Sequence, residues 1–222
     1  MMEEDYLAQA EQFVSFQFPW IKEQYKNRKI FSSCYIDSIF KNNKIIGVDL
    51  LLRYDPPIGI TVLIGGNRSK YIITSVVEAL ELNDAANKYH LPNRVKLYTD
   101  TEKANKRGIR LFNKVIKNED FTLNKIYLVK YIKTLLEVIG YEGSITESYG
   151  IVKKMDNDTE ERYYRIAEPP AMEFSGENIK VIFCTYYYYA KGPLNKWTLL
   201  VKPNGEIISY KMEYPLKEYM GK

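Results

Sequence analysis

Three β-prone runs between Asn178 and Tyr214 constrain the fold more strongly than any other part of the sequence. They read NIKVIFCTYYYY, NKWTLLVK and EIISYKMEY, and short polar segments separate them. The last two runs are joined by Pro203, Asn204 and Gly205. An Asn-Gly pair favours a tight hairpin because both residues tolerate positive φ. We therefore expect a C-terminal antiparallel β-meander.

The first of these runs ends in four consecutive tyrosines. Side chains alternate along a strand, so the first and third tyrosines share one face while Tyr187 and Tyr189 share the other. Apolar residues precede both pairs in phase, which is typical of a strand covered on two sides. The alternative is that Tyr187 and Tyr189 form an outer contact patch with Trp197, since rigid aromatic side chains dominate binding hot spots.

The N-terminal part predicts helix followed by strands. Apolar residues at near-helical spacing between Glu3 and Lys29 predict one broken helix or two short ones, with the break at Pro19. Two β-prone runs around the polar turn at 41–44 predict a hairpin, and residues 59–65 predict a third strand.

The middle of the chain predicts two helices that begin with capping signals. Ser75 and Glu78 have capping-box spacing, so a helix is expected from about Val76, with Val77 and Leu80 among its buried residues. Thr99 and Glu102 repeat this spacing before a helix over 101–117, in which Gly108 is expected to weaken the middle.

A third helix is predicted from about Thr122 to Ile139, with Ile126 on its apolar stripe and Gly140 as its stop. Together these patterns predict an α+β fold in which amphipathic helices pack on a mainly antiparallel sheet and a β-meander ends the chain. We expect one domain over residues 1–222, with an alternative internal boundary near 140–150.

The start of the chain and its cysteines suggest a location for the protein. The N-terminal sequence is acidic and lacks the features of a secretory signal, and no segment approaches the roughly 20 apolar residues that span a bilayer. We therefore expect a cytoplasmic protein without a membrane segment. Cys34 and Cys184, the only two cysteines, lie in strand-like runs and are expected to be buried, reduced thiols.

Residues with catalytic or metal-binding chemistry are scarce in this sequence. The only histidine, His90, stands at a predicted helix end, so a site with two histidine ligands is excluded. The acidic run at 156–161 lacks the glycine and the distal glutamate of an EF-hand loop, and is typical of a solvated hairpin tip. The segment at 65–70, GGNRSK, lacks phosphate-loop spacing and predicts a tight turn. We predict no catalytic residue, no metal site and no cofactor.

Basic residues are concentrated on one predicted helix. They follow one another mostly at intervals of three or four, which places them on one face opposite the apolar stripe. Between Arg94 and Lys133 there are eleven Lys or Arg and four acidic residues, a local charge of +7 in a chain of net charge +4. Such a face suits an acidic protein surface or a nucleic-acid backbone, although many lysine-rich helical faces are only solvated. The six residues of this basic face are Lys103, Lys106, Arg107, Arg110, Lys114 and Lys117.

The leading hypothesis is a non-catalytic protein-binding role toward a partner with an acidic surface. By analogy with compact proteins that act by surface complementarity, the partner would be a toxin or effector that an immunity or anti-defence protein neutralises. Replacing Lys106, Arg107 and Arg110 with Glu is then expected to abolish binding and to leave the fold intact.

Two other functions remain open. A nucleic-acid-associated protein would use the basic helix 101–117, and its binding would fall steeply with salt. A carboxylate-based enzyme would use acids such as Asp156 and Asp158, or others brought together by the fold. The oligomeric state is left open.

Overall fold

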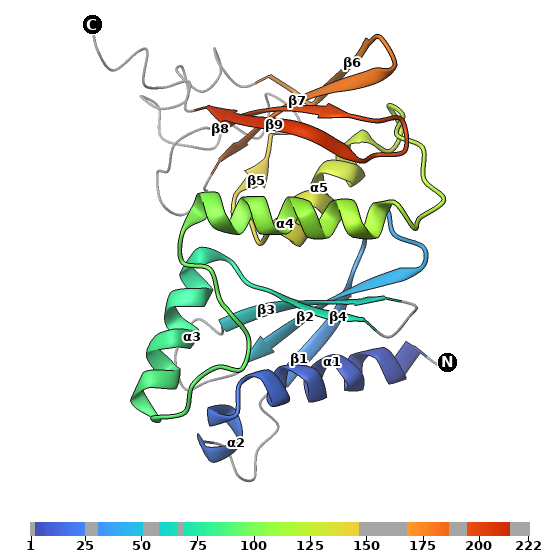
Figure 1. Cartoon of the computed structure of the whole chain (residues 1–222). Helices are drawn as coiled ribbons and strands as arrows, with labels where there is room; N and C mark the ends of the chain where they lie inside the picture. Colours follow the sequence, from blue (N-terminus) through green and yellow to red (C-terminus); the bar gives the residue numbers. More distant parts are fainter. Residues whose placement is uncertain are drawn as a thin grey trace, which may run out of the picture. The chain divides into compact units, whose positions relative to one another are not determined.

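The computed structural model describes residues 3–24, 31–50, 58–65, 69–146, 168–186 and 195–213. In this part of the chain five helices and two antiparallel sheets form an α+β fold that ends in a strand meander, as the sequence predicts (Figure 1). Contacts divide the chain into two compact units. Unit 1 comprises Met1–Glu119 and Thr134–Tyr141, and unit 2 comprises Asp120–Lys133 and Glu142–Lys222. Whether the chain is one domain stays a prediction.

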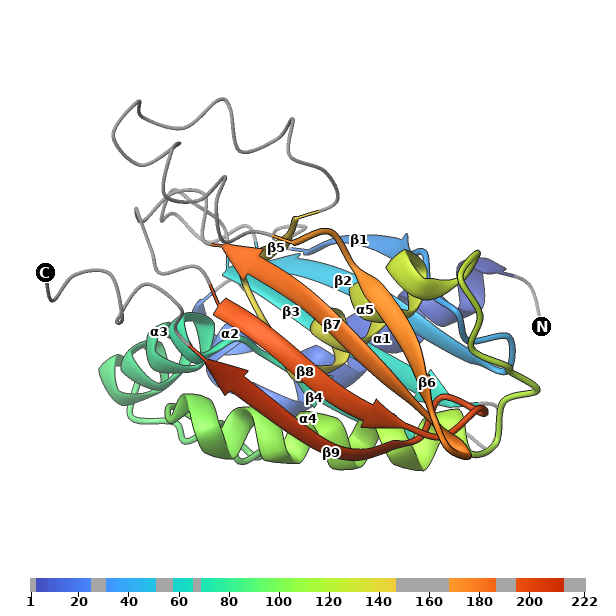
Figure 2. The same cartoon turned by 90° about the horizontal axis from the view of Figure 1, so that it is seen from above.

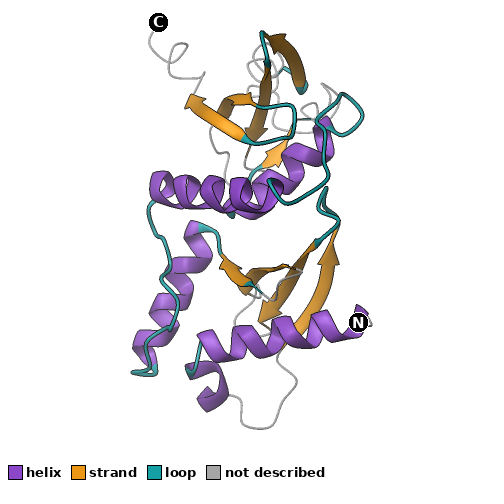
Figure 3. Ribbon diagram, turned by 45° about the vertical axis from the view of Figure 1, so that its right-hand side comes forward, coloured by secondary structure: helices purple, strands orange, loops and turns teal. Residues whose placement is uncertain are grey.

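The sheet of unit 1 has four strands in the order β1-β2-β3-β4. Figure 3 draws the strands of the protein in orange and its helices in purple. They are β1 (Phe31–Ile36), β2 (Asn43–Leu50), β3 (Ile58–Gly65) and β4 (Lys70–Ile73). The predicted hairpin and third strand are confirmed. The sequence did not separate β4 from the helix that follows, because β4 has only four residues and only Thr74 and Ser75 lie between it and that helix.

One face of this sheet packs against the helices α1 (Glu3–Gln17), α2 (Trp20–Gln24) and α3 (Val76–Lys88). The gap between α1 and α2 contains Pro19, which confirms the predicted break. The core of this layer consists of alternate residues of β2 and β3 together with apolar residues of the three helices. Its largest fully buried side chains from α1, α2 and the turn between them are Phe18, Trp20 and Ile21.

Helix α3 begins with the predicted capping box: Ser75 Oγ accepts from the Glu78 amide at 3.1 Å, and the Glu78 carboxylate accepts from the Ser75 amide at 3.0 Å. The predicted buried face was wrong in part, since Val77 is 50% and Leu80 48% exposed. Ala79 is buried, as predicted, and the other buried residues are Leu82 and Ala86. Small alanines let α3 approach β3 closely, so the stripe that packs is not the one richest in large apolar residues.

The single histidine of the sequence, His90, lies just after the C-terminal end of α3. His90 has φ 55°, its amide donates to the Asn87 carbonyl at 3.1 Å, and the next amide, of Leu91, donates to the Ala86 carbonyl at 3.1 Å. These two hydrogen bonds define a Schellman motif, in which the left-handed position usually belongs to glycine. His90 is therefore an exposed helix-end residue, as the sequence predicts.

Replacing His90 with Gly should stabilise unit 1 by about 0.5 to 1 kcal/mol, because glycine adopts positive φ without the steric cost that a Cβ carries. Urea denaturation measures the effect. His90→Ala is the matched control, since it keeps the Cβ and should give no gain. A glycine variant no more stable than wild type would contradict the assignment of strain to this backbone position.

Helix α4 (Thr101–Ile116) is capped by Asp100, whose carboxylate accepts from the Lys103 amide at 2.8 Å. The predicted cap, Thr99, is one residue too early, since Asp100 competes for the same position and is an equally good cap. Helix α4 contacts the connection between β1 and β2 through Phe112, whose ring lies 5.7 Å from that of Phe40.

Helix α5 (Leu128–Ile139) begins six residues later than predicted. Asn124 Oδ1 accepts from the amides of Ile126 and Tyr127 at 3.0 and 3.2 Å, which makes a turn where the pattern had predicted helix. Ile126, placed on the buried stripe by the sequence, is 87% exposed. The predicted stop is confirmed, because Gly140 has φ 68° and closes a second Schellman motif.

The sheet of unit 2 has the order β5-β7-β8-β9, with β6 also paired to β7 (Figure 2). Its strands are β5 (Ser144–Ile145), β6 (Ala171–Ser175), β7 (Asn178–Tyr186), β8 (Asn195–Val201) and β9 (Ile207–Glu213). Every pairing is antiparallel, and Gly205 between β8 and β9 has φ 87°, so the predicted meander and its turn are confirmed. On β7, Phe183, Cys184, Thr185 and Tyr186 are all buried, which confirms two-sided burial up to Tyr186.

Both cysteines are free, but only Cys184 is buried. The expectation that Cys34 is also buried was wrong: it lies on β1, at the edge of its sheet, and is exposed. In the described part of the chain, no helix combines the length and the apolar character needed to cross a membrane.

Candidate functional site

The candidate site is the basic face of α4, whose six residues occupy a sector of about 100° around the helix axis at 3.6 residues per turn. Lys117 lies directly after the last helical residue and keeps helical dihedrals, with φ −60° and ψ −25°. Five of the six residues are exposed, and Arg107 is partly buried. The opposite side of the helix buries Ile109, Phe112 and Ile116, so the amphipathic pattern read from the sequence is present.

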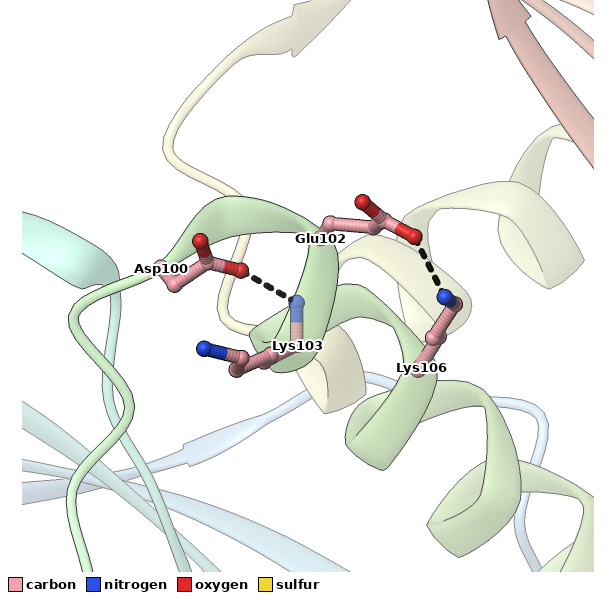
Figure 4. A network of polar contacts seen from close by, with 4 residues as sticks. All are labelled: Asp100, Glu102, Lys103 and Lys106. Atoms are coloured by element: carbon pink, nitrogen blue, oxygen red, sulfur yellow. Dashed lines mark hydrogen bonds and ion pairs between the residues drawn. The ribbon is translucent and has the colours of Figure 1, made fainter.

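Two acidic residues lie at the start of this face (Figure 4). The Asp100 carboxylate caps the helix, and Glu102 pairs with Lys106 one turn further on. Both Glu102 and Lys106 are solvent-exposed, so the pair contributes little to stability. The N-terminal end of the face therefore carries both signs of charge, whereas its C-terminal end is purely basic.

Arg107 is turned into unit 1 rather than outward. Its Nη2 donates to the Ile72 carbonyl at 2.9 Å, and its guanidinium carbon lies 5.2 Å from the centre of the Tyr98 ring. Burial lowers the pKa of this guanidinium, which nevertheless remains protonated at neutral pH. Arg107 thus joins α4 to β4, and replacing it with Glu would disturb packing as well as surface charge.

The side chain of Lys114 also contacts β4, through Tyr71. Its Nζ donates to the Tyr71 hydroxyl at 2.7 Å and lies 5.2 Å from the centre of the Tyr71 ring. The hydrogen bond from Lys114 lowers the pKa of the Tyr71 phenol, while partial burial acts in the opposite direction. Both partners are exposed enough to remain part of the surface.

The basic face thus divides into an outward set and an anchored pair. Lys103, Lys106, Arg110 and Lys117 form the outward set, and Arg107 and Lys114 are anchored to β4 and its neighbours. Tyr98 and Tyr71, which hold the anchored pair, were missed by sequence analysis. No local pattern points to them, because Tyr71 is contacted by Lys114, 43 positions away, and Tyr98 by Arg107 on the following helix.

For the second predicted contact patch, the structure describes Trp197 but not the two tyrosines. Tyr187 and Tyr189 lie outside the described residues. Trp197 is fully buried: its Nε1 donates to Thr185 Oγ1 at 3.0 Å, and its ring stacks on Phe183 at 5.7 Å between centroids. Trp197 is therefore a core residue of the unit 2 sheet, and it is left out of the proposed interface.

The described residues contain no group of three or more His, Cys, Asp or Glu side chains placed to hold a metal ion. Burial raises the pKa of the Cys184 thiol, which makes it a poor nucleophile. The acidic run 156–161 lies outside the described residues. Of the segment 65–70, only the flanks are described: the Gly65 amide donates to the Ser69 carbonyl at 2.8 Å, next to the antiparallel pairing of β3 with β4.

The remaining functional signal is therefore a mixed-charge, predominantly basic helix face with two aromatic anchors. The chain matches no protein-family model, none of the curated proteins and none of the solved structures with which it was compared.

Proposed function

We propose that this chain is a non-catalytic protein-binding protein whose docking surface is the outward set of α4. The observation that carries the proposal is that Lys103 and Arg110 are exposed and donate from their side chains to no described residue, so their charges are available to a partner. An acidic partner surface would pair with these charges, and such pairs set on-rate and specificity.

Asp100 and Glu102 favour a protein over a nucleic acid as the partner. Both are exposed at the N-terminal end of the face. A phosphate backbone, which is uniformly negative, would be repelled at this end. A protein surface that is mainly acidic but carries isolated basic residues complements both signs. In the more specific form of the proposal, the partner is a toxin or effector that the chain neutralises by covering its surface.

The test is a charge reversal of the outward set, Lys103→Glu with Arg110→Glu, which leaves the anchored Arg107 and Lys114 unchanged. The tagged variant should lose a protein partner that wild type captures from a lysate of the source organism after nuclease treatment. Reversing two unit 2 lysines, Lys180→Glu with Lys211→Glu, makes the same change in net charge and should leave capture intact.

Three outcomes separate the alternatives. A nuclease-resistant partner whose activity is suppressed in the complex and restored by the reversal would support the neutraliser. Bound material that disappears with nuclease would replace this proposal with the nucleic-acid alternative. Equal capture by wild type and the α4 variant would exclude α4 as the docking surface.

A further inference from the structure

The segment between α3 and α4 carries basic residues that lie outside the helix. Its burial alternates: Leu91, Val95 and Leu97 pack against the core of unit 1, whereas Arg94 and Lys96 are exposed. The segment therefore presents two cations to solvent while its apolar side chains hold it against the protein.

Hydrogen bonds fix this segment to three helices. The Arg94 amide donates to the Gln17 carbonyl at the end of α1 at 2.8 Å. Asn93 bridges α2 and α3, because its Oδ1 accepts from Trp20 Nε1 at 2.9 Å and its Nδ2 donates to Asn83 Oδ1 at 2.9 Å. The backbone that carries the two cations is thus held in place before any partner arrives.

Aromatic rings hold the cations themselves. The Arg94 guanidinium lies 4.3 Å from the centre of the Phe16 ring, and Lys96 Nζ lies 5.4 Å from the centre of the Tyr98 ring. Tyr98 is also the ring that contacts Arg107, at 5.2 Å. The contacts Lys96–Tyr98–Arg107 therefore connect the segment to the basic face of α4.

We propose that residues 94–98 and the basic face of α4 form one docking surface for an Asp/Glu-rich polypeptide segment of the partner, with Tyr98 as a positioning residue. This inference rests on the proposed function. Between Arg94 and Lys117 the chain has eight basic residues and two acidic ones. Cations already positioned on rings lose less side-chain freedom on binding, which favours affinity.

The aromatic rings of this surface already contact cations, which favours carboxylates over nucleobases as the ligand. Proteins that bind single-stranded nucleic acid offer aromatic faces on which bases stack. Here Phe16, Tyr98 and Tyr71 are each engaged by an Arg or Lys side chain of unit 1. The surface thus presents positioned cations, and Arg guanidinium groups match carboxylates in a two-pronged geometry.

The experiment measures the fluorescence anisotropy of a labelled Glu-rich copolymer of glutamate and lysine, whose isolated lysines can face Asp100 and Glu102, titrated with the full chain at low salt. Arg94→Gln with Lys96→Gln should weaken binding about fivefold to tenfold, since two positioned charges are removed. Lys180→Gln with Lys211→Gln removes the same charge from unit 2 and should change affinity by less than about twofold.

Tyr98→Leu should weaken binding while Tyr98→Phe preserves it, because Phe keeps the ring that positions Lys96 and Arg107. Circular dichroism and thermal unfolding confirm that each variant is folded.

A second pair, Lys103→Gln with Arg110→Gln, separates this inference from the proposed function. If this pair weakens binding and the 94/96 pair does not, the extension to 94–98 is overturned and the α4 surface stands. If neither pair differs from the unit 2 control, both are overturned. Tighter binding of a labelled single-stranded oligonucleotide, with the same response to the variants, would overturn the assignment to an acidic polypeptide.

Discussion

Replacing Gly108 with Ala should destabilise unit 1 by about 2 to 4 kcal/mol, even though alanine is the better helix former by about 1 kcal/mol. A Cβ at this position would lie 2.4 Å from the Ile139 Cα and 2.7 Å from its Cγ2. Nonbonded carbon atoms prefer a separation of about 3.5 to 4.0 Å, so α4 and α5 would have to move apart by about 1 Å. That movement would loosen contacts along the whole crossing, and urea denaturation measures the loss.

Two variants show whether the helix crossing is the cause. Arg110→Ala is exposed on the same helix and should change stability by no more than about 0.5 kcal/mol. Shortening the neighbour by Ile139→Ala should not rescue Gly108→Ala, because the closest atom is the backbone Cα of Ile139. A Gly108→Ala protein as stable as wild type, or one rescued by Ile139→Ala, would show that the helices are not held this closely.

Gly108 also illustrates where sequence analysis stops. In the sequence it is a weak helix residue, and that interpretation follows correctly from its propensity. Its actual role is to allow a second helix to approach, which depends on a residue 31 positions away in the chain. Local patterns identified α4, its amphipathic face and the stop of α5 at Gly140, because caps and periodicity are properties of neighbouring residues. They could not identify which element lies across the crossing.

The same limit applies to the candidate site. The spacing of the six basic residues was sufficient to place them on one helix face. Their division into outward and anchored residues was not accessible, because it depends on Tyr71, Tyr98 and the Ile72 carbonyl, which come from other elements. Trp197 was misplaced for a related reason: a tryptophan suits a binding surface and a core equally well, and its full burial and its contacts with Thr185 and Phe183 come from the folded sheet.

Glu119 carries the second large expected effect, and no sequence pattern pointed to it. It follows α4 and is only 8% exposed. Its Oε2 accepts from the amides of Lys41 and Asn42 at 2.7 and 3.0 Å, and its Oε1 accepts from Asn43 Nδ2 at 2.5 Å. One carboxylate thus satisfies three donors at the turn between β1 and β2, 76 to 78 positions away in the sequence.

Glu119→Ala should therefore destabilise unit 1 by about 2 to 3 kcal/mol, because hydrogen bonds to a charged acceptor are among the strongest and the Asn43 amide would remain buried without this partner. Glu119→Gln should cost about 1 to 2 kcal/mol, since the side chain keeps its shape but one acceptor oxygen becomes a donor facing other donors.

Glu142→Ala, at an exposed position, is the control and should cost at most about 0.5 kcal/mol. Hydrogen exchange adds a local measurement: the amides of Lys41 and Asn42 should exchange faster in both Glu119 variants than in wild type. If Glu119→Ala were as stable as the control, the carboxylate would not be what holds the β1–β2 turn.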